Sequence, residues 1–317
     1  MAHQTLAVGV DLGGTTAKAG LISSTGEIIA QSKVPTLADD GPKAVVGQVV
    51  KAIEEVLSYV NGATVQGIGI GAAGIIEKEG GTVKSPPNFK NWNSVPLGDE
   101  IQQVFKMRVE VENDANVAAI AEAKFGAGKE YPDFLFVIWG TGVGGGIILD
   151  HKIYRGPHGG AGEVGHISID YKGVQCNCGS RGCVEAYIGQ RYLSARTIEG
   201  LKLHPESKIL QLVGGDLSKV EPLYINQAAE AGDAFARTIF EEAGLFLGTA
   251  LASVMNIMDL RVSIIGGGVS AAGKFVFDAI TKATIAGVQA PLKPGIKILP
   301  AQLGNTAGIL GAAGLVL

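Results

Sequence analysis

The chain has 317 residues, 46% of them hydrophobic, and a formal net charge of −4. This length favours two packed units over one core. The excess of acidic residues, without a Lys/Arg cluster, argues against a nucleic-acid partner. No apolar run reaches the roughly 18–20 residues of a membrane span. The first five residues lead into an apolar run without the basic stretch and cleavage site of a signal peptide, so we expect a cytoplasmic protein with no membrane partner.

Apolar residues are spaced along the chain in a way that predicts alternating strands and helices, and therefore the α/β class. Residues 6–10 are typical of a buried strand, and 17–22 and 27–33 are its expected hairpin partners. The further expected strands are 65–70, 108–112, 133–139, 147–150 and 261–265. The expected helices are 43–60, 97–105, 115–125, 234–258, 272–280 and 306–317.

Two segments share one pattern, in which a strand leads into a Gly-Thr turn and a second strand follows. Backbone N–H groups in such a turn form a concavity that binds anions, and the hydroxyl groups add donors. The first segment is neither a Walker-type loop nor a dinucleotide fingerprint, because no Gly-Lys-Ser/Thr follows and Gly13-Gly14 opens a strand. An ordinary hairpin with a surface Asp is the alternative for it. The predicted phosphate-binding residues are Asp11, Gly13, Gly14, Thr15, Thr16, Gly140, Thr141 and Gly142.

The repetition of this pattern suggests two similar α/β halves, each offering one turn to a shared cleft. A boundary near residues 115–117 would place the cleft and a hinge between the halves. Asp11 at its strand end could hold Mg²⁺ through water, since this ion prefers oxygen and keeps its water. A third glycine run would let adenine or its ribose lie against the backbone of Gly267, Gly268 and Val269, and close packing is the alternative reason for these glycines.

All three cysteines lie within eight positions, at Cys176, Cys178 and Cys183, downstream of His166, one of five histidines. Three thiolates and one imidazole complete a tetrahedral set for Zn²⁺ of the structural type. A disulfide is a poor alternative, because Cys176-x-Cys178 is too short for a relaxed one and an odd count leaves one thiol over. Three unrelated small apolar residues are the other alternative. We predict a structural zinc site in a Gly-rich loop.

Glu112-Asn-Asp-Ala-Asn116 stands where an expected strand becomes a helix. One interpretation of Asp114 is a helix N-cap, a position that Asp and Asn favour. The other is a general base, since a carboxylate at a strand end in the cleft can accept a hydroxyl proton as that oxygen attacks phosphorus. Asn113 beside it could fix a sugar hydroxyl.

Glu163, His166 and Glu185 present acceptors and a donor from the loop system around the cysteines. Free sugars are bound through many such hydrogen bonds, and one ring nitrogen of His166 can ligate zinc while the other points at the substrate. The two carboxylates could instead be solvated loop charges. The polar loop 85–92, which holds Asn88, is suited to covering a sugar, and a plain surface turn fits it equally well.

Together these motifs resemble the ROK family (repressors, open reading frames, kinases), and within it the bacterial ATP-dependent glucokinases. Asp114 falls on the family's catalytic aspartate, Lys18 closes its first phosphate motif, and the zinc segment with Glu163 and Glu185 matches its zinc and sugar signature. The match runs from about residue 6 to the end of the chain. The matching segments are 11–18, 112–116, 140–146, 163–185, 266–269 and 307–313.

The resemblance implies the actin/hexokinase-like (ribonuclease H-like) α/β fold, with two domains and an interdomain cleft. The smaller domain would be 1–115, completed by a C-terminal helix at 305–317, and the larger one 116–304 with the zinc loop. It also implies ATP with Mg²⁺ as donor, the 6-hydroxyl group of a hexose as acceptor, and a homodimer or homotetramer. The segment 69–74 lacks the proline common before the last glycine in this family, which leaves Gly74 less certain as a sugar contact.

Glucose is the expected hexose, and kinases for N-acetylmannosamine or fructose are the main alternative. A sugar-responsive repressor would share the core but needs a DNA-reading module, and the first expected strand begins near residue 6. A non-catalytic sugar-binding regulator would need neither Asp114 nor both phosphate turns. A polyphosphate donor is less expected than ATP, because such relatives often lack the zinc motif.

Overall fold

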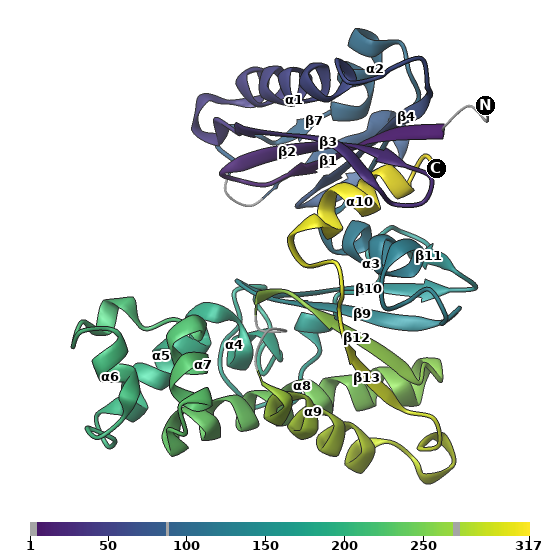
Figure 1. Cartoon of the computed structure of the whole chain (residues 1–317). Helices are drawn as coiled ribbons and strands as arrows, with labels where there is room; N and C mark the ends of the chain where they lie inside the picture. The colour runs from purple at the N-terminus through teal and green to yellow at the C-terminus, as the bar shows by residue number, and fades with distance from the viewer. Residues whose placement is uncertain (1–4, 87–88, 269–272) are drawn as a thin grey trace. The chain divides into compact units, whose positions relative to one another are not determined.

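The computed structural model describes residues 5–86, 89–268 and 273–317. They form two compact units, between which the chain passes four times (Figure 1). These compact units do not follow the boundary expected near residue 115, because residues 116–132 and 146–161 pack in unit 1. Where the folding domains begin and end stays a prediction. Unit 1 comprises Met1–Pro132, Gly146–Ala161 and Gln302–Leu317, and unit 2 comprises Asp133–Gly145 and Gly162–Ala301.

The first sheet has five strands in the order β3-β2-β1-β4-β8. Strands β1, β2 and β3 form an antiparallel meander, and β4 and β8 extend the sheet parallel to β1. β1 is buried on both faces, which explains its nearly continuous apolar sequence. The strand bounds are β1 Thr5–Leu12, β2 Thr16–Ser23, β3 Ile28–Pro35, β4 Thr64–Ala72 and β8 Val109–Asn113.

The second sheet repeats this topology in the order β11-β10-β9-β12-β13, again with a meander followed by two parallel strands. The two Gly-Thr turns occupy the same place, between the first and second strands of each meander. The predicted similarity of two α/β halves is therefore a feature of the structure. The strand bounds are β9 Phe134–Trp139, β10 Val143–Leu149, β11 Lys152–Tyr154, β12 Val262–Gly266 and β13 Lys297–Pro300.

The strand expected at 147–150 begins four residues earlier, at Val143. The three glycines before the expected strand, at 144–146, therefore lie in β10 and not in a turn. Their small size serves packing: a Cβ on Gly145 would lie 2.6 Å from the Gly162 carbonyl oxygen, and one on Gly146 2.7 Å from the Ala119 Cβ. The second turn is thus confined to residues 140–142.

Helix α10 (Ala307–Gly314) packs directly on β1 and β4 of unit 1. Glycines in the strands permit this approach, because a Cβ on Gly9 would lie 1.9 Å from the Ile309 carbonyl oxygen and one on Gly69 1.7 Å from that of Ala312. The same approach brings Gly308 against Asp11, so the final helix supports the first Gly-Thr segment.

This packing predicts opposite effects of two Gly→Ala substitutions. Gly69→Ala should lower the free energy of unfolding by about 1–3 kcal/mol or more, because the backbone of α10 must move away. Gly47→Ala on the exposed side of α1 (Pro42–Leu57) meets no atom within 4 Å and should raise the free energy of unfolding by about 0.5–1 kcal/mol. Urea unfolding of both variants measures this. Equal free energies of unfolding for the two variants would contradict the close approach of α10 to the strands.

A buried carboxylate anchors the segment that leads into α10. Glu122 of α3 (Asp114–Phe125) is fully buried. Its oxygens accept hydrogen bonds from the backbone N–H groups of Ala127, Gln302 and Leu303, at 2.7, 2.9 and 2.9 Å. A buried carboxylate is tolerated only when its oxygens are satisfied in this way. The side chain therefore holds the chain as it leaves α3 and as it returns before α10.

The helices expected at 97–105 and 234–258 are α2 and α8 in the structure, with unchanged bounds. Sequence patterning missed the short helices between residues 185 and 230 and the small sheet β5-β6-β7. The remaining helices are α1 Pro42–Leu57, α3 Asp114–Phe125, α4 Glu185–Ile188, α5 Gln190–Leu201, α6 Lys208–Leu212, α7 Pro222–Glu230, α9 Lys274–Gly287 and α10. The remaining strands are β5 Ile75–Glu77, β6 Thr82–Lys84 and β7 Ser94–Val95.

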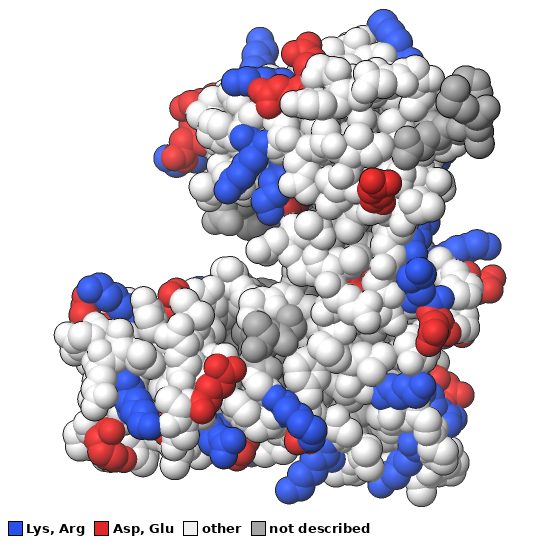
Figure 2. Space-filling model, in the orientation of Figure 1, with Lys and Arg blue, Asp and Glu red and all other residues white. Residues whose placement is uncertain are grey.

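Helix α8 (Ala234–Met258) is the one helix of the described residues that is long and apolar enough to cross a membrane. Of its most apolar window, 56% is buried inside the protein, and the helix packs along α9 and against α7. It is a core helix of unit 2. On the face drawn in Figure 2, basic and acidic side chains are interspersed. The cytoplasmic location stays a prediction.

Candidate active site

The carboxyl ends of β1, β4 and β8 meet at one edge of the first sheet. Leu12 pairs with Ala72, and Ala72 pairs with Asn113, so these strands end in register. The Asn113 side chain donates a hydrogen bond of 3.2 Å to the carbonyl oxygen of Gly74, just beyond β4. The edge therefore gathers the first Gly-Thr turn, Gly74, Asn113 and Asp114.

The first Gly-Thr turn is closed by its own backbone and by Thr36. The Gly13 N–H donates to the Thr16 carbonyl at 3.1 Å, while Thr36 donates its hydroxyl to Gly13 and its N–H to Thr15. The Thr15 side chain is exposed at the tip of the turn. The turn is thus preformed, with a hydroxyl group facing solvent.

Asp11 lies directly before this turn and is half-buried. Its carboxylate pairs with the ammonium group of Lys18 on the neighbouring strand, at 3.3 Å, and a Cβ on Gly308 would lie 2.6 Å from its Cγ. The side chain is therefore confined between β2 and the start of α10. An oxygen ligand for Mg²⁺ would stand here beside a cation and a phosphate turn.

Asn113, not Asp114, is the N-cap of α3, which excludes the capping interpretation of Asp114. The Asn113 Oδ1 accepts from the N–H groups of Ala115 and Asn116, at 2.9 and 3.3 Å, and Asp114 is the first helical residue. One Asp114 oxygen, Oδ1, accepts from the Ala115 N–H at 2.9 Å.

The environment makes the Asp114 carboxylate more basic. Loss of hydration among the surrounding protein atoms raises its pKa from the ordinary value, and the charge of Asp11 adds to this, while the hydrogen bond from Ala115 acts in the opposite direction. The residue as a whole is nevertheless exposed to solvent, which limits this loss of hydration. An accessible carboxylate with a raised pKa is a typical general base.

Glu185 holds the second Gly-Thr turn in unit 2. Its Oε2 accepts from the Val143 N–H at 2.9 Å, and a Cβ on Gly142 would lie 2.5 Å from this oxygen. The Gln190 N–H, at the start of α5, donates to the carbonyl groups of Gly140 and Thr141. The residue predicted to bind sugar therefore also fixes the predicted phosphate turn.

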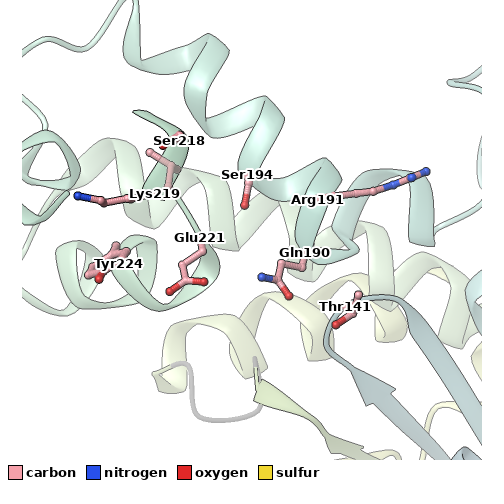
Figure 3. Close-up of a pocket in the computed structure, with 9 residues that line it drawn as sticks. Thr141, Gln190, Arg191, Ser194, Ser218, Lys219, Glu221 and Tyr224 are labelled. Atoms are coloured by element: carbon pink, nitrogen blue, oxygen red, sulfur yellow. The ribbon is translucent and has the colours of Figure 1, made fainter. Parts of the chain in front are cut away.

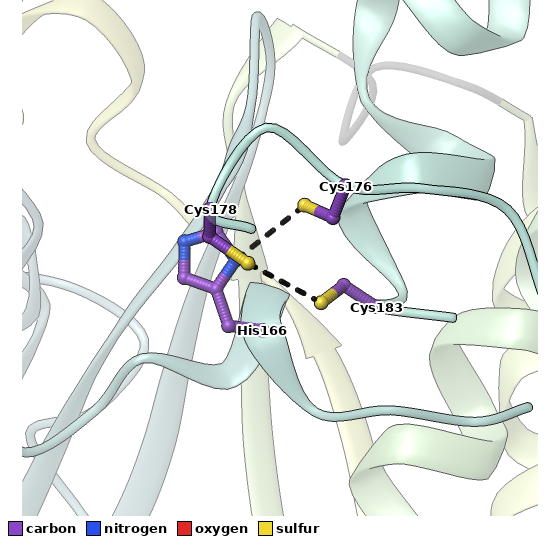
Figure 4. A group of neighbouring side chains, drawn as sticks. All are labelled: His166, Cys176, Cys178 and Cys183. Carbon is purple, nitrogen blue, oxygen red and sulfur yellow. Dashed lines mark hydrogen bonds between the residues drawn. The ribbon is translucent and has the colours of Figure 1, made fainter. Parts of the chain in front are cut away.

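His166, Cys176, Cys178 and Cys183 converge, with their ligand atoms within 4.8 Å of one another (Figure 4). The Sγ atoms of Cys178 and Cys183 are 3.6 Å apart, and Cys176 Sγ is 3.9 Å from the His166 Nδ1. Zn–S bonds of about 2.3 Å in a tetrahedron place two sulfurs about 3.8 Å apart, whereas a disulfide needs about 2.05 Å. The cluster fits a structural zinc ion.

The thiols of the cluster are in unequal states without a cation. Burial, with the neighbouring thiols, raises the pKa of Cys183 to about 12, whereas a hydrogen bond from the backbone of Ser180 lowers the pKa of Cys178. Three thiolates become compatible at this spacing only when a cation binds and displaces their protons. This chemistry favours Zn²⁺ as well.

The zinc loop also fixes the predicted sugar-binding groups of unit 2. Cys183 pairs with Ser168 in a β-bridge and stands two residues before Glu185, which opens α4. Glu163 is exposed, and its Oε2 lies 4.0 Å from the His166 Nε2. The ring therefore turns Nδ1 to the thiols and Nε2 toward Glu163.

A cavity of about 520 Å³ opens beside Thr141 in unit 2 (Figure 3). Its walls come from α5 and from the segment leading into α7, and it is the main feature that sequence reasoning missed. Gln190, five residues after Glu185, is its one member close to a recognised motif. The lining residues are Thr141, Gln190, Arg191, Ser194, Ser218, Lys219, Val220, Glu221 and Tyr224.

Gly267 and Gly268 of the third glycine run lie in different surroundings. Gly267 has a positive φ, and a Cβ there would lie 2.2 Å from the Trp139 carbonyl oxygen, so packing accounts for it. Gly268 is exposed with no atom within 4 Å. Asn88 and Val269 lie outside the described residues. The predicted site residues thus form one group in each unit, and the shared cleft stays a prediction.

The ROK family model matches residues 7–317. The chain belongs to the ROK family. Its fold, with two five-stranded mixed sheets, is the predicted actin/hexokinase-like fold of ROK sugar kinase structures. Both the family resemblance and the fold class predicted from the sequence are confirmed.

Relatives within the ROK family differ in function. A glucokinase of Streptomyces coelicolor is 37% identical over 313 residues, covering 98% of this chain and 97% of that protein. A crystal structure of a ROK family glucokinase from Streptomyces griseus in complex with glucose and AMPPNP is 37% identical with a TM-score of 0.83, covering 98% and 99%. A xylose repressor of Caldicellulosiruptor bescii is 31% identical over 314 residues, covering 98% of this chain and 77% of the repressor.

Proposed function

We propose that this ROK protein transfers the γ-phosphoryl group of ATP to the 6-hydroxyl group of glucose. The observation that carries the proposal is the state of Asp114: its neighbour takes the capping role, the residue is exposed, and the pKa of its carboxyl group is raised. The first Gly-Thr turn follows β1, which lies on the other side of β4 from β8, and opens at the same sheet edge. The glucokinase relatives, which match this chain nearly end to end, support the same conclusion.

Asp114 would accept the proton of the 6-hydroxyl group as its oxygen attacks phosphorus. Positioning and charge stabilisation supply most of the rate enhancement in such transfers. A base whose pKa is raised toward the working pH takes the proton more readily. Asn113, held at Gly74, would place the sugar beside it.

The phosphate groups of ATP would be bound by the two Gly-Thr turns, with Mg²⁺ near Asp11 and Lys18. The cavity beside Thr141 continues from the second turn and is large enough for a nucleoside. We assign it to the nucleoside part of ATP, with Gly268 exposed for close approach. Mg²⁺ would neutralise charge that develops on the phosphate oxygens.

Zinc would be held by His166, Cys176, Cys178 and Cys183 and would supply rigidity rather than reactivity. A closed set of four ligands leaves no open position for a substrate. The protein groups that it orients would bind the hexose: Glu163, the Nε2 of His166, and the Glu185 oxygen that does not accept from Val143.

The second candidate is a kinase for another hexose, N-acetylmannosamine or fructose, because the same groups can bind related sugars. A non-catalytic regulator, suggested by the repressor relative, would have no need for a free base beside a phosphate turn. A homodimer or homotetramer stays a prediction.

A coupled ADP-release assay over a panel of sugars tests the proposed function. We expect glucose to give the highest kcat/KM, with N-acetylmannosamine, fructose and xylose below it and water alone near background. Sugar binding by calorimetry without any sugar-dependent ADP release would contradict a kinase and favour a regulator.

A further inference from the structure

Glu112, the residue before the predicted sugar contact Asn113, carries a charge that the proposed reaction does not use. It is only 5% exposed, although it stands one residue from the end of β8. A buried carboxylate without partners would be strongly destabilising. Its partners therefore show what the residue does.

Glu112 holds the backbone on both sides of Asp114. Its Oε1 accepts a hydrogen bond of 2.9 Å from the Asn113 N–H and one of 3.0 Å from the Asn116 side chain. These donors lie immediately before Asp114 and two residues after it. One oxygen atom thus fixes the strand-to-helix junction that aims the Asp114 carboxylate.

The other oxygen, Oε2, accepts from the Arg155 Nε. Arg155 follows β11, and its segment continues to Glu163. Buried ion pairs are poor sources of stability, because desolvation offsets most of the attraction, but breaking one leaves an uncompensated charge. Here the Glu112 end of the pair is buried and the Arg155 end is half-buried, and the pair is better explained by the geometry that it fixes.

We propose that Glu112 and Arg155 form a positioning pair that sets the orientation of Asn113 and Asp114 for phosphoryl transfer. This role rests on the proposed function of Asp114. Arg155 holds the Glu112 carboxylate in one rotamer, and that carboxylate holds the junction. Neither side chain needs to touch the substrate.

The cavity next to the pair allows a chemical test. A space of about 790 Å³ is lined by both Glu112 and Arg155, and the Arg155 side chain is 36% exposed. Truncation of Arg155 would open this space to the Glu112 carboxylate, and free guanidinium has the planar donor geometry that the carboxylate needs.

Glu112→Gln and Arg155→Ala should lower kcat by roughly 10- to 100-fold, because a small misplacement of a catalytic group has this effect, while the KM for ATP stays unchanged. Millimolar guanidinium should raise kcat of Arg155→Ala and not that of the native protein. Glu110→Gln and Arg108→Ala are matched controls, since they break an exposed ion pair at the start of β8. If Arg155→Ala does not fold, Arg155→Lys replaces it, with a smaller expected loss of kcat.

Hydrogen exchange of the segment 113–117 distinguishes this proposal from the proposed function. In Glu112→Gln the side chain can accept at one end only, so that its amide NH₂ meets either Arg155 or the two Asn donors. This variant should therefore lose protection at the Asn113 N–H, whether or not the native protein phosphorylates glucose, whereas Glu110→Gln should not. If the native protein phosphorylates glucose and both pair variants have the same kcat as the native protein, the positioning role is overturned and the proposed kinase function is not affected. An inactive native protein would overturn the kinase instead.

Discussion

Asp114→Asn should lower kcat for glucose phosphorylation by roughly 10²- to 10⁴-fold, the usual contribution of a general base. The amide has nearly the same shape and can still accept the Ala115 N–H, but it cannot take a proton from the 6-hydroxyl group. Binding of glucose, measured by calorimetry, should stay close to native. A near-native rate in the purified variant would exclude Asp114 as the base.

The same substitution has a thermodynamic signature. The raised pKa of Asp114 means that ionisation disfavours the folded state, so this group's contribution to stability is present at low pH and is lost as pH rises through the folded-state pKa. Asparagine cannot ionise, so the variant should melt above the native protein at neutral pH and lose this advantage in acid. Hydrogen bonds from Ser218 lower the pKa of Asp216, so Asp216→Asn should have the opposite sign.

Cys178→Ser should release zinc and weaken sugar binding. Removal of a side chain that only orients a metal ligand lowers metal affinity by about 10- to 100-fold. Removal of the ligand itself should lower the affinity for zinc by more than this. The KM for glucose should rise more than that for ATP, because Glu163 and His166 lie on the zinc loop. Metal analysis and saturation kinetics measure both effects.

Ser180→Ala in the same loop is the matched control and should keep its zinc. Chelation of the native protein should reproduce the Cys178→Ser kinetics, and added Zn²⁺ should restore the native protein only. Full activity of a protein shown to be free of zinc would contradict the structural role of the metal.

Local patterns were sufficient for much of the fold and the site. Strong apolar periodicity located α2 and α8, and the spacing of three cysteines located the metal cluster, because ligand geometry limits the sequences that can form it. The helices between 185 and 230 were missed, since segments such as α4 and α6 have only four and five residues.

Contacts between distant segments were not predictable. Glu112 and Arg155 are 43 positions apart, and nothing near either residue marks the other as its partner. The glycines of β10 look like a turn because the reason for their size lies in α3 and in the segment around Gly162. The sequence does not show which of Asn113 and Asp114 caps α3, because Asn and Asp both favour the N-cap position.

Identification of the product tests the central claim most directly. Phosphorus NMR of the native protein incubated with glucose, ATP and Mg²⁺ should show glucose 6-phosphate and ADP in equal amounts, and Asp114→Asn should show neither above background. Inorganic phosphate as the only new signal, or phosphate on another hydroxyl group, would contradict a base aimed at the 6-hydroxyl group.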